Sequence, residues 1–369
     1  MIPDGRQLGR VAYHFNNAMM RLKRFISLLV MAAICTLAGA QEVNKAKELF
    51  DTMSKYFSLK AYGQFAYEYE SKDKTNSFYT RRIILFGNVN LHKRLELFYM
   101  FSAASGFKPL EVGGKIKICD EFNVSVGQMK VPYTMQAMMS LSKDELIEGA
   151  LPANYIANVD ASDEAYSGGT SHGGRDFGIM IEGSAINIPS SDKKLLDYKV
   201  GLFNGQGINQ KDKNNHKDVC VYLALNPLSC LKVTGGTYLG KARALADRPE
   251  DRIVNGTDYT RNRWFAGFQL TTKPVMLRAE YLEGKNNESI ARGAYATTMV
   301  RMWKNLDLLG SVAYLKKNKD AHGDTYRYVA GVEYRFFARC RFQLQYQREH
   351  DNYTHTDNNQ LITQLQLGF

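Results

Sequence analysis

The chain has 369 residues, with 48 Lys and Arg against 37 Asp and Glu and a formal net charge of +11 at pH 7. Its mean hydropathy is −0.35, and after residue 40 no apolar run approaches the roughly 20 residues that a transmembrane helix needs. This excludes a helical membrane protein, but not a barrel whose strands are apolar on only one face.

The first 40 residues have the pattern of an export signal. Met20–Arg24 is basic, Phe25–Leu37 is apolar, and Ala38–Ala40 offers small side chains at a cleavage position. This order predicts a signal peptide over residues 20–40, with residues 1–19 as an upstream extension that is not translated. Residues 1–40 carry five Lys or Arg and one Asp, so the remaining chain has a net charge of +7. The basicity is therefore partly a targeting feature and does not require a nucleic-acid partner.

A short N-terminal segment follows the signal. Apolar residues recur every three or four positions from Val43 to Phe57, which favours a short amphipathic helix. We expect residues 41–59 to form a periplasmic segment that precedes the main domain.

From residue 60 onward, apolar and polar residues alternate in segments of strand length. At the C-terminus, Leu361, Leu365 and Phe369 fall on one face, and Gln364 and Gln366 fall on the other. Such alternation predicts sixteen strands, near residues 60–70, 78–90, 93–103, 111–118, 122–130, 174–187, 195–204, 217–226, 231–241, 261–272, 275–284, 291–303, 306–316, 326–337, 340–349 and 360–369.

The polar faces of these strands are too hydrophilic for a protein core. Arg, Glu and Gln on one side of a closed sheet need water, whereas the apolar side suits lipid. The sequence therefore predicts an all-β fold over residues 60–369, a transmembrane antiparallel β-barrel with a watered lumen.

Connection lengths support this interpretation. Tight links are expected at 91–92, 119–121, 227–230, 273–274, 304–305 and 338–339, and a slightly longer one near 188–194. Longer polar links are expected at 131–173, 205–216, 242–260, 285–290, 317–325 and 350–359. Strict alternation of the two kinds indicates short periplasmic turns at one rim and longer extracellular loops at the other, in the outer membrane of a Gram-negative bacterium.

Three stretches resemble the phosphate-selective porin O and P family. They are Gly127–Tyr133, Gly174–Gly178, and Val200–Gly207 followed by Lys217–Val219. The resemblance extends from about Ala61 to Phe369. It implies a sixteen-stranded general or anion-favouring diffusion channel, commonly trimeric, with a long third loop folded into the pore.

The predicted constriction loop departs from the family's phosphate specialists. Residues 131–173 contain one basic residue, Lys143, and six acids, Asp144, Glu145, Glu148, Asp160, Asp163 and Glu164. Charges at the narrowest point of a channel set its local potential, so acids there would repel phosphate. The alternative is that these acids are solvated loop charges away from the pore.

Charges on the predicted inward faces are mixed. The basic candidates for pore lining are Lys115, Lys117, Lys199, Lys232, Arg263, Arg278, Arg327, Arg335 and Arg341. The opposing acids are Glu68, Glu96, Asp176, Glu182, Asp197, Asp218, Glu280 and Glu333. No unbroken arginine ladder is present, and many of these charges could pair across neighbouring strands.

Enzymatic chemistry finds little support. Gly235–Lys241 has phosphate-loop spacing, but Ala242 stands where a magnesium-binding hydroxyl is needed and no helix is expected after it. A barrel protease needs an Asp–His pair at the rim, and His350, Asp351, His355 and Asp357 could supply the residues, yet crowded polar loop tips are common. Asp160, Asp163 and Glu164 have oxygen ligands without a defined calcium spacing. We expect no enzyme, no cofactor and no metal site.

The function predicted from the sequence is an outer-membrane diffusion porin that passes small hydrophilic solutes and ions with weak charge preference. Its expected partners are outer-membrane lipid and those solutes, with a homotrimer left open and no nucleic acid. The alternatives are an outer-membrane binding or adhesion barrel and a truly phosphate-selective channel.

Overall fold

The computed structural model describes residues 56–157, 174–188, 193–244, 246–317, 323–352 and 354–369. Ala61–Gly368 form one compact unit, and the description below concerns that unit. The predicted upstream extension, the signal peptide and nearly all of the segment 41–59 lie outside the described residues. They remain predictions.

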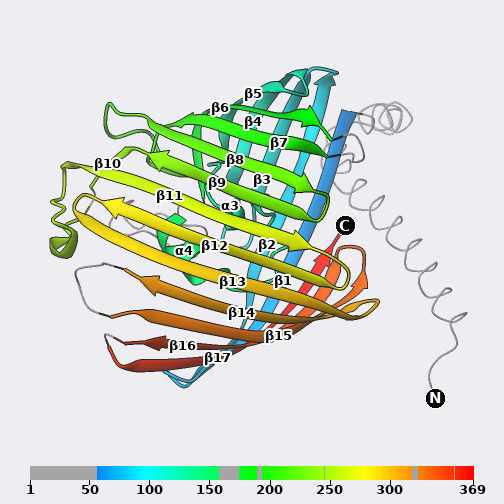
Figure 1. The fold of residues 1–369 in the computed structure, drawn as a ribbon, viewed down its shortest axis with the longest axis vertical. Helices are drawn as coiled ribbons and strands as arrows, with labels where there is room; N and C mark the ends of the chain where they lie inside the picture. Colours follow the sequence, from blue (N-terminus) through cyan, green and yellow to red (C-terminus); the bar gives the residue numbers. More distant parts are fainter. Residues whose placement is uncertain (1–55, 158–173, 189–192, 245, 318–322, 353) are drawn as a thin grey trace, which may run out of the picture. The chain divides into compact units, whose positions relative to one another are not determined.

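Seventeen strands form one antiparallel sheet (Figure 1). They are β1 (Phe57–Glu70), β2 (Thr75–His92), β3 (Leu95–Ser102), β4 (Lys108–Cys119), β5 (Phe122–Lys130), β6 (Arg175–Asn187), β7 (Lys194–Phe203), β8 (Asp218–Leu228), β9 (Leu231–Leu239), β10 (Lys241–Arg243), β11 (Asp258–Thr271), β12 (Val275–Asn286), β13 (Ser289–Trp303), β14 (Leu306–Lys316), β15 (Thr325–Phe337), β16 (Cys340–Asp351) and β17 (Thr356–Gly368). Two short helices, α3 (Met135–Met138) and α4 (Leu151–Ala157), and the 3-10 helix η2 (Pro249–Asp251) complete the described elements. None of the described helices is long and apolar enough to cross a bilayer.

The sheet closes on itself. β17 pairs with β1, and β1 pairs with β2. β9 and β10 both pair with β11 and are separated only by Gly240, so they are one interrupted strand. A Cβ on Gly240 would lie 2.0 Å from Oδ1 of Asp218, which explains glycine at this break. The barrel therefore has sixteen strands, and the predicted fold class is confirmed.

The predicted alternation of link lengths is wrong in detail. The link predicted at 285–290 is a two-residue turn, Asn287-Glu288, and β1 joins β2 through residues 71–74 only. Asn287 has φ 51, a left-handed conformation that asparagine tolerates and that tight hairpins use. At both links the hydrogen-bonded strands continue past the apolar, outward-facing belt of the barrel into polar residues. For the same reason β2 begins at Thr75 and β17 at Thr356, earlier than predicted.

The two faces of the sheet differ in chemistry, as the alternation predicted. On β17, Leu365 and Leu367 are 37% and 44% exposed on the outside, whereas Gln364 and Gln366 are each 3% exposed on the inside. The exterior is apolar and the interior is polar. Such a barrel has the architecture of an outer-membrane protein.

Candidate functional site: a lumen narrowed by an internal loop

Residues 131–157 fold into the barrel, where α3 and α4 lie (Figure 1). The side-chain amide of Gln64 on β1 donates to the carbonyl of Leu141 at 3.4 Å, and Gln366 on β17 donates to that of Ser142 at 3.2 Å. On the other side of the lumen, α4 packs against β12, β13 and β14. Residues 131–157, the described part of the loop, therefore contact the inner wall on two sides of the lumen.

Inward glutamines on β1, β16 and β17 line the wall beside the loop, and we call them the glutamine wall: Gln64, Gln343, Gln345, Gln364 and Gln366. Four of them bond the loop, and Gln364 bonds Gln343. Gln345 donates to the carbonyl of Glu145 at 2.7 Å and accepts from the amide of Ile147 at 3.1 Å. Gln64 bonds Gln366, and Gln364 bonds Gln343, each at 2.8 Å. A primary amide both donates and accepts hydrogen bonds, so it can bond the backbone N–H and C=O groups of a loop that lies against the inner wall. The sequence placed these residues on the inward face but gave no sign of this role.

Two of the three described acids of the loop turn toward the barrel wall. Glu145 receives two hydrogen bonds from Arg278, at 2.8 and 3.0 Å. Glu148 forms an ion pair with Arg81. Arginines of the wall therefore balance the charges of both acids. Asp160, Asp163 and Glu164 lie outside the described residues.

Asp144 is buried in the loop between the amide of Leu146, which donates at 3.1 Å, and the side chain of Gln136. Burial first, and then the neighbouring Glu145, raise the pKa of Asp144 well above its usual value near 4. A raised pKa means that the folded loop binds the proton more tightly than the unfolded chain. This contribution to stability is full below about pH 4 and is lost as the pH rises through the raised pKa.

We therefore expect acidification from pH 7.5 to pH 5 to attach the loop more firmly. Limited proteolysis of the barrel in detergent measures this, with slower cleavage within 140–150 at pH 5. Asp144→Asn, which resembles the protonated acid, should make the cleavage rate insensitive to pH over this range. Faster cleavage at pH 5 in the unmodified chain would contradict the sign of the shift.

A second group of charges lies on the inward faces of β4, β6 and β7. Glu182 accepts from both Lys115 and Lys199, and the three side chains are 12%, 27% and 26% exposed, respectively. Beside them, Lys117 pairs with Glu96. These side chains stay accessible inside the barrel, so they can meet a passing solute. Their charges largely cancel.

The other predicted lining residues also lie on inward positions, most of them in pairs. Arg327 bonds Glu349 at 2.6 Å, and Arg341 bonds Glu333 at 2.8 Å. Arg335 bonds both Asp307, at 2.5 Å, and Glu333, at 2.7 Å. Lys232 lines a cavity between β7, β8, β9 and β11. Arg327 and Arg341 each pair with an acid on the neighbouring strand, as the sequence suggested for many of these charges.

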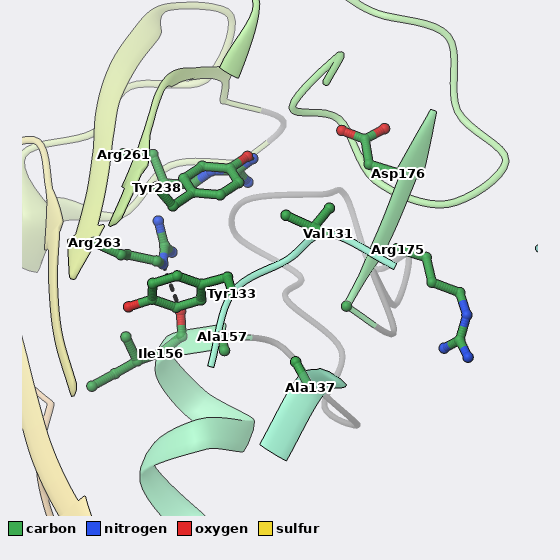
Figure 2. Close-up of a pocket in the computed structure, with 11 residues that line it drawn as sticks. Val131, Tyr133, Ala137, Ile156, Ala157, Arg175, Asp176, Tyr238, Arg261 and Arg263 are labelled. Atoms are coloured by element: carbon green, nitrogen blue, oxygen red, sulfur yellow. Dashed lines mark hydrogen bonds between the residues drawn. The ribbon is translucent and has the colours of Figure 1, made fainter. Parts of the chain in front are cut away.

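A cavity lies between the loop and β9 and β11 (Figure 2). Tyr133 and Ala157 line it from the loop, and Tyr238, Arg261 and Arg263 line it from the wall. Arg263 donates through Nε to the carbonyl of Ile156 at 2.5 Å. Arg261 donates to the Tyr238 hydroxyl at 2.6 Å. Arg263 therefore joins the loop to the wall, whereas Arg261 bonds a neighbouring strand of the wall.

The three family-like stretches meet beside this cavity. The amide of Gly205 donates to Asp176, and Arg261 donates to Asp218 at 3.1 Å. A Cβ on Gly205 would lie 2.4 Å from Asp218. These motif residues form a buried polar network that fixes the chain after β7. Figure 2 shows Arg175 extending away from the cavity; it pairs with Glu111.

The inward arginines that sequence reasoning missed include Arg261, Arg81 and Arg82. Arg261 precedes Arg263 by two positions, so the alternation of β11 could have found it. Arg81 precedes Arg82, and both reach inward, Arg81 to Glu148 and Arg82 to Gln64 at 3.1 Å. Two neighbours on one face break the period of two, which is why the pattern did not reveal Arg81.

Comparison with known proteins gives the fold. No protein-family model and no curated protein sequence matches the chain. Among solved structures, it is similar to an anion-selective porin from Comamonas acidovorans, with 12% identity and a TM-score of 0.64, covering 85% of this chain and 99% of that one. It is also similar to OmpT, an outer-membrane protein of Vibrio cholerae (12%, TM-score 0.61, 85% and 97% covered). OmpF of Salmonella typhi, solved as a complex with daunomycin, matches with 13% identity, a TM-score of 0.56, and 85% and 97% covered. The chain thus has the fold of outer-membrane porins.

Proposed function

We propose that the protein is a diffusion porin in the outer membrane of a Gram-negative bacterium. It passes small hydrophilic solutes and ions with weak charge preference and catalyses no reaction. The observation that carries this proposal is a closed barrel, polar inside and apolar outside, whose lumen is crossed by a loop fixed to its inner wall. Such a loop narrows a water-filled path without plugging it.

The weak charge preference follows from pairing. Glu145 and Glu148 of the loop pair with wall arginines, and Glu182 lies between Lys115 and Lys199. The electrostatic potentials of two opposite charges in a pair largely cancel at a distance. Salt also screens each charge beyond about 8 Å at physiological ionic strength. The net charge of +7 predicted after residue 40 gives only a slight preference for anions.

The sequence supports the finer parts of the proposal. The pattern of residues 20–40 favours export, and the alternation of link lengths favours long loops on the extracellular side. The family resemblance favours assembly as a homotrimer. OmpT of Vibrio cholerae has also been solved in a trimer form. A phosphate-selective channel remains the second candidate, because Arg261 and Arg263 line one cavity. Both arginines donate to protein acceptors there, which leaves fewer donors for a dehydrated phosphate.

Planar-bilayer recording tests this function. We expect open channels in potassium chloride, a reversal potential near zero in a salt gradient, and no block by micromolar phosphate. Removing the central acid by Glu182→Gln should shift the reversal potential toward anion preference, because Lys115 and Lys199 lose their counter-charge. Glu70→Gln, at an inward position on β1, serves as a matched control. Block at micromolar phosphate would favour the selective channel, and a folded barrel without conductance would favour a binding or adhesion role.

A further inference from the structure

The internal loop divides the lumen into a filled part and an open part. Between β8 and β14, inward side chains such as Tyr222 and Tyr295 are nearly fully buried, and they share one apolar cluster with Tyr133, Leu146 and Ile156 of the loop. Side chains packed in van der Waals contact leave no continuous path for water. Solutes must therefore pass the loop on another side.

The stretch Met139–Ser142 forms the boundary of the filled part. At one end, Nζ of Lys130, the last residue of β5, donates to the first carbonyl of the stretch. At the other end, Gln64 on β1 and Gln366 on β17 donate to the carbonyls of its third and fourth residues, at 3.4 and 3.2 Å. The strands that connect β1 to β5 in the sheet are β2, β3 and β4. The stretch therefore crosses the lumen opposite the inner face of β2–β4.

Polar side chains on the inner face of β2–β4 remain accessible. On β4, Lys115 and Lys117 are 27% and 41% exposed, and Asn90 on β2 is exposed as well. Across the barrel, the inward Thr297 on β13 is 1% exposed and bonds Ser311. Hydrated, polar walls are what a water-filled channel requires. This contrast favours a solute path along β2–β4.

The loop contributes a positive charge to this space. Lys143 directly follows the stretch Met139–Ser142, is exposed, and bonds no acid of the described chain through its ammonium. The neighbouring acids are engaged elsewhere. Glu145 and Glu148 pair with wall arginines, and the buried Asp144 accepts from a backbone amide of the loop. Because the loop lies inside the barrel, an exposed side chain on it faces the water of the lumen.

The charges of the nearby wall do not offset Lys143. Lys115 faces Ser125 on β5, five residues before Lys130, which holds the loop. At about 3.3 Å per residue this is roughly 16 Å along the strand, twice the distance of about 8 Å over which salt screens a charge. Closer to the loop, Glu111 on β4 pairs with an arginine of β6 at 2.8 Å, and Lys130 has the same sign as Lys143. The local potential beside the loop is therefore positive.

We propose that solutes pass the loop along β2–β4 and that Lys143 sets the slight preference of the channel for anions at this point. The proposal rests on the proposed diffusion function and names the residue that determines its charge preference. The solutes that it favours are small, hydrated, monovalent anions. A single exposed ammonium attracts such an ion but does not supply the converging donors that would replace its hydration shell.

Cysteine accessibility tests the path. Lys117→Cys, inward on β4, and Thr297→Cys, inward on β13, are each treated with a charged methanethiosulfonate during recording in planar bilayers. We expect a loss of current for Lys117→Cys and none for Thr297→Cys, because only the first side chain lies in accessible space. The unmodified barrel, whose Cys119 is exposed at the end of β4, is the control for native thiols. A loss of current for Thr297→Cys would place the path against β13 and overturn the proposal.

Reversal potentials in a potassium chloride gradient test Lys143. Lys143→Glu should lower the chloride-to-potassium permeability ratio about threefold or more, and Lys143→Arg should leave it unchanged, because the charge of the side chain is what attracts the anion. Lys304→Glu, in the exposed turn between β13 and β14, changes the net charge equally and should keep the original ratio. An unchanged ratio in Lys143→Glu channels that conduct normally overturns the proposal but leaves the diffusion function intact, whereas a folded, unmodified barrel without conductance contradicts the diffusion function itself.

Discussion

Deletion of residues 140–157 should raise single-channel conductance at least about twofold, because this segment crosses the lumen. One end of it is held by the glutamine wall, and the other packs as α4 on β12–β14. Conductance through a short water-filled constriction scales with its open cross-section, so removing the obstruction has a large effect. The measurement is the conductance step in planar bilayers at fixed salt concentration.

Two controls make the deletion informative. The shift of the folded band on heating in detergent shows whether the barrel has formed. Glu145→Gln removes the charge that meets Arg278 but leaves the backbone bonds to Gln343 and Gln345, so its conductance should change little. If the deletion variant folds and conducts as before, the loop does not narrow the path and the proposed constriction is lost.

The barrel could be predicted because the alternation of apolar and polar residues can be recognised within each strand alone. A period of two assigns each residue to one face whatever the partner strand is, and Gln364, Gln366, Leu365 and Leu367 occupy the predicted faces. Tight turns such as Asn287-Glu288 were harder to find, since polar strand ends resemble loops in composition. Alternation finds the membrane-facing belt, and it is less informative where strands extend into water.

The partners of the charged loop residues could not be predicted in the same way. Glu145 meets Arg278, 133 positions away, and Gln345 reaches the carbonyl of Glu145 across 200 positions. Composition shows that acids are present but not which wall residue each one meets. Packing decides whether a carboxylate contributes to the potential of the pore. Six acids in the loop sequence therefore suggested a constriction that repels phosphate, whereas in the structure Glu145 and Glu148 are each paired with an arginine of the wall.

Asp218→Ala should destabilise the barrel by about 3–5 kcal/mol, the typical cost of removing one partner from a buried ion pair. Asp218 is 0% exposed, and its carboxylate accepts from Arg261 at 3.1 Å, from the amide of Lys241 at 3.0 Å and from the Tyr238 hydroxyl. Alanine removes the carboxylate that Arg261 bonds at 3.1 Å and the acceptor of a backbone amide at the break between β9 and β10. The midpoint of urea unfolding in detergent or lipid measures the loss.

Asp258→Asn supplies the matched control, because Asp258 pairs with Arg243 at 3.2 Å near the surface on the neighbouring strands. Exposed pairs of this kind contribute no more than about 1 kcal/mol. Asp218→Asn should fall between the two, since it keeps an acceptor for the amide of Lys241 but loses the charge that Arg261 requires. If Asp218→Ala unfolds at the same urea concentration as Asp258→Asn, the network is not what fixes the chain after β7, and the Gly205 and Gly240 approaches to Asp218 need another explanation.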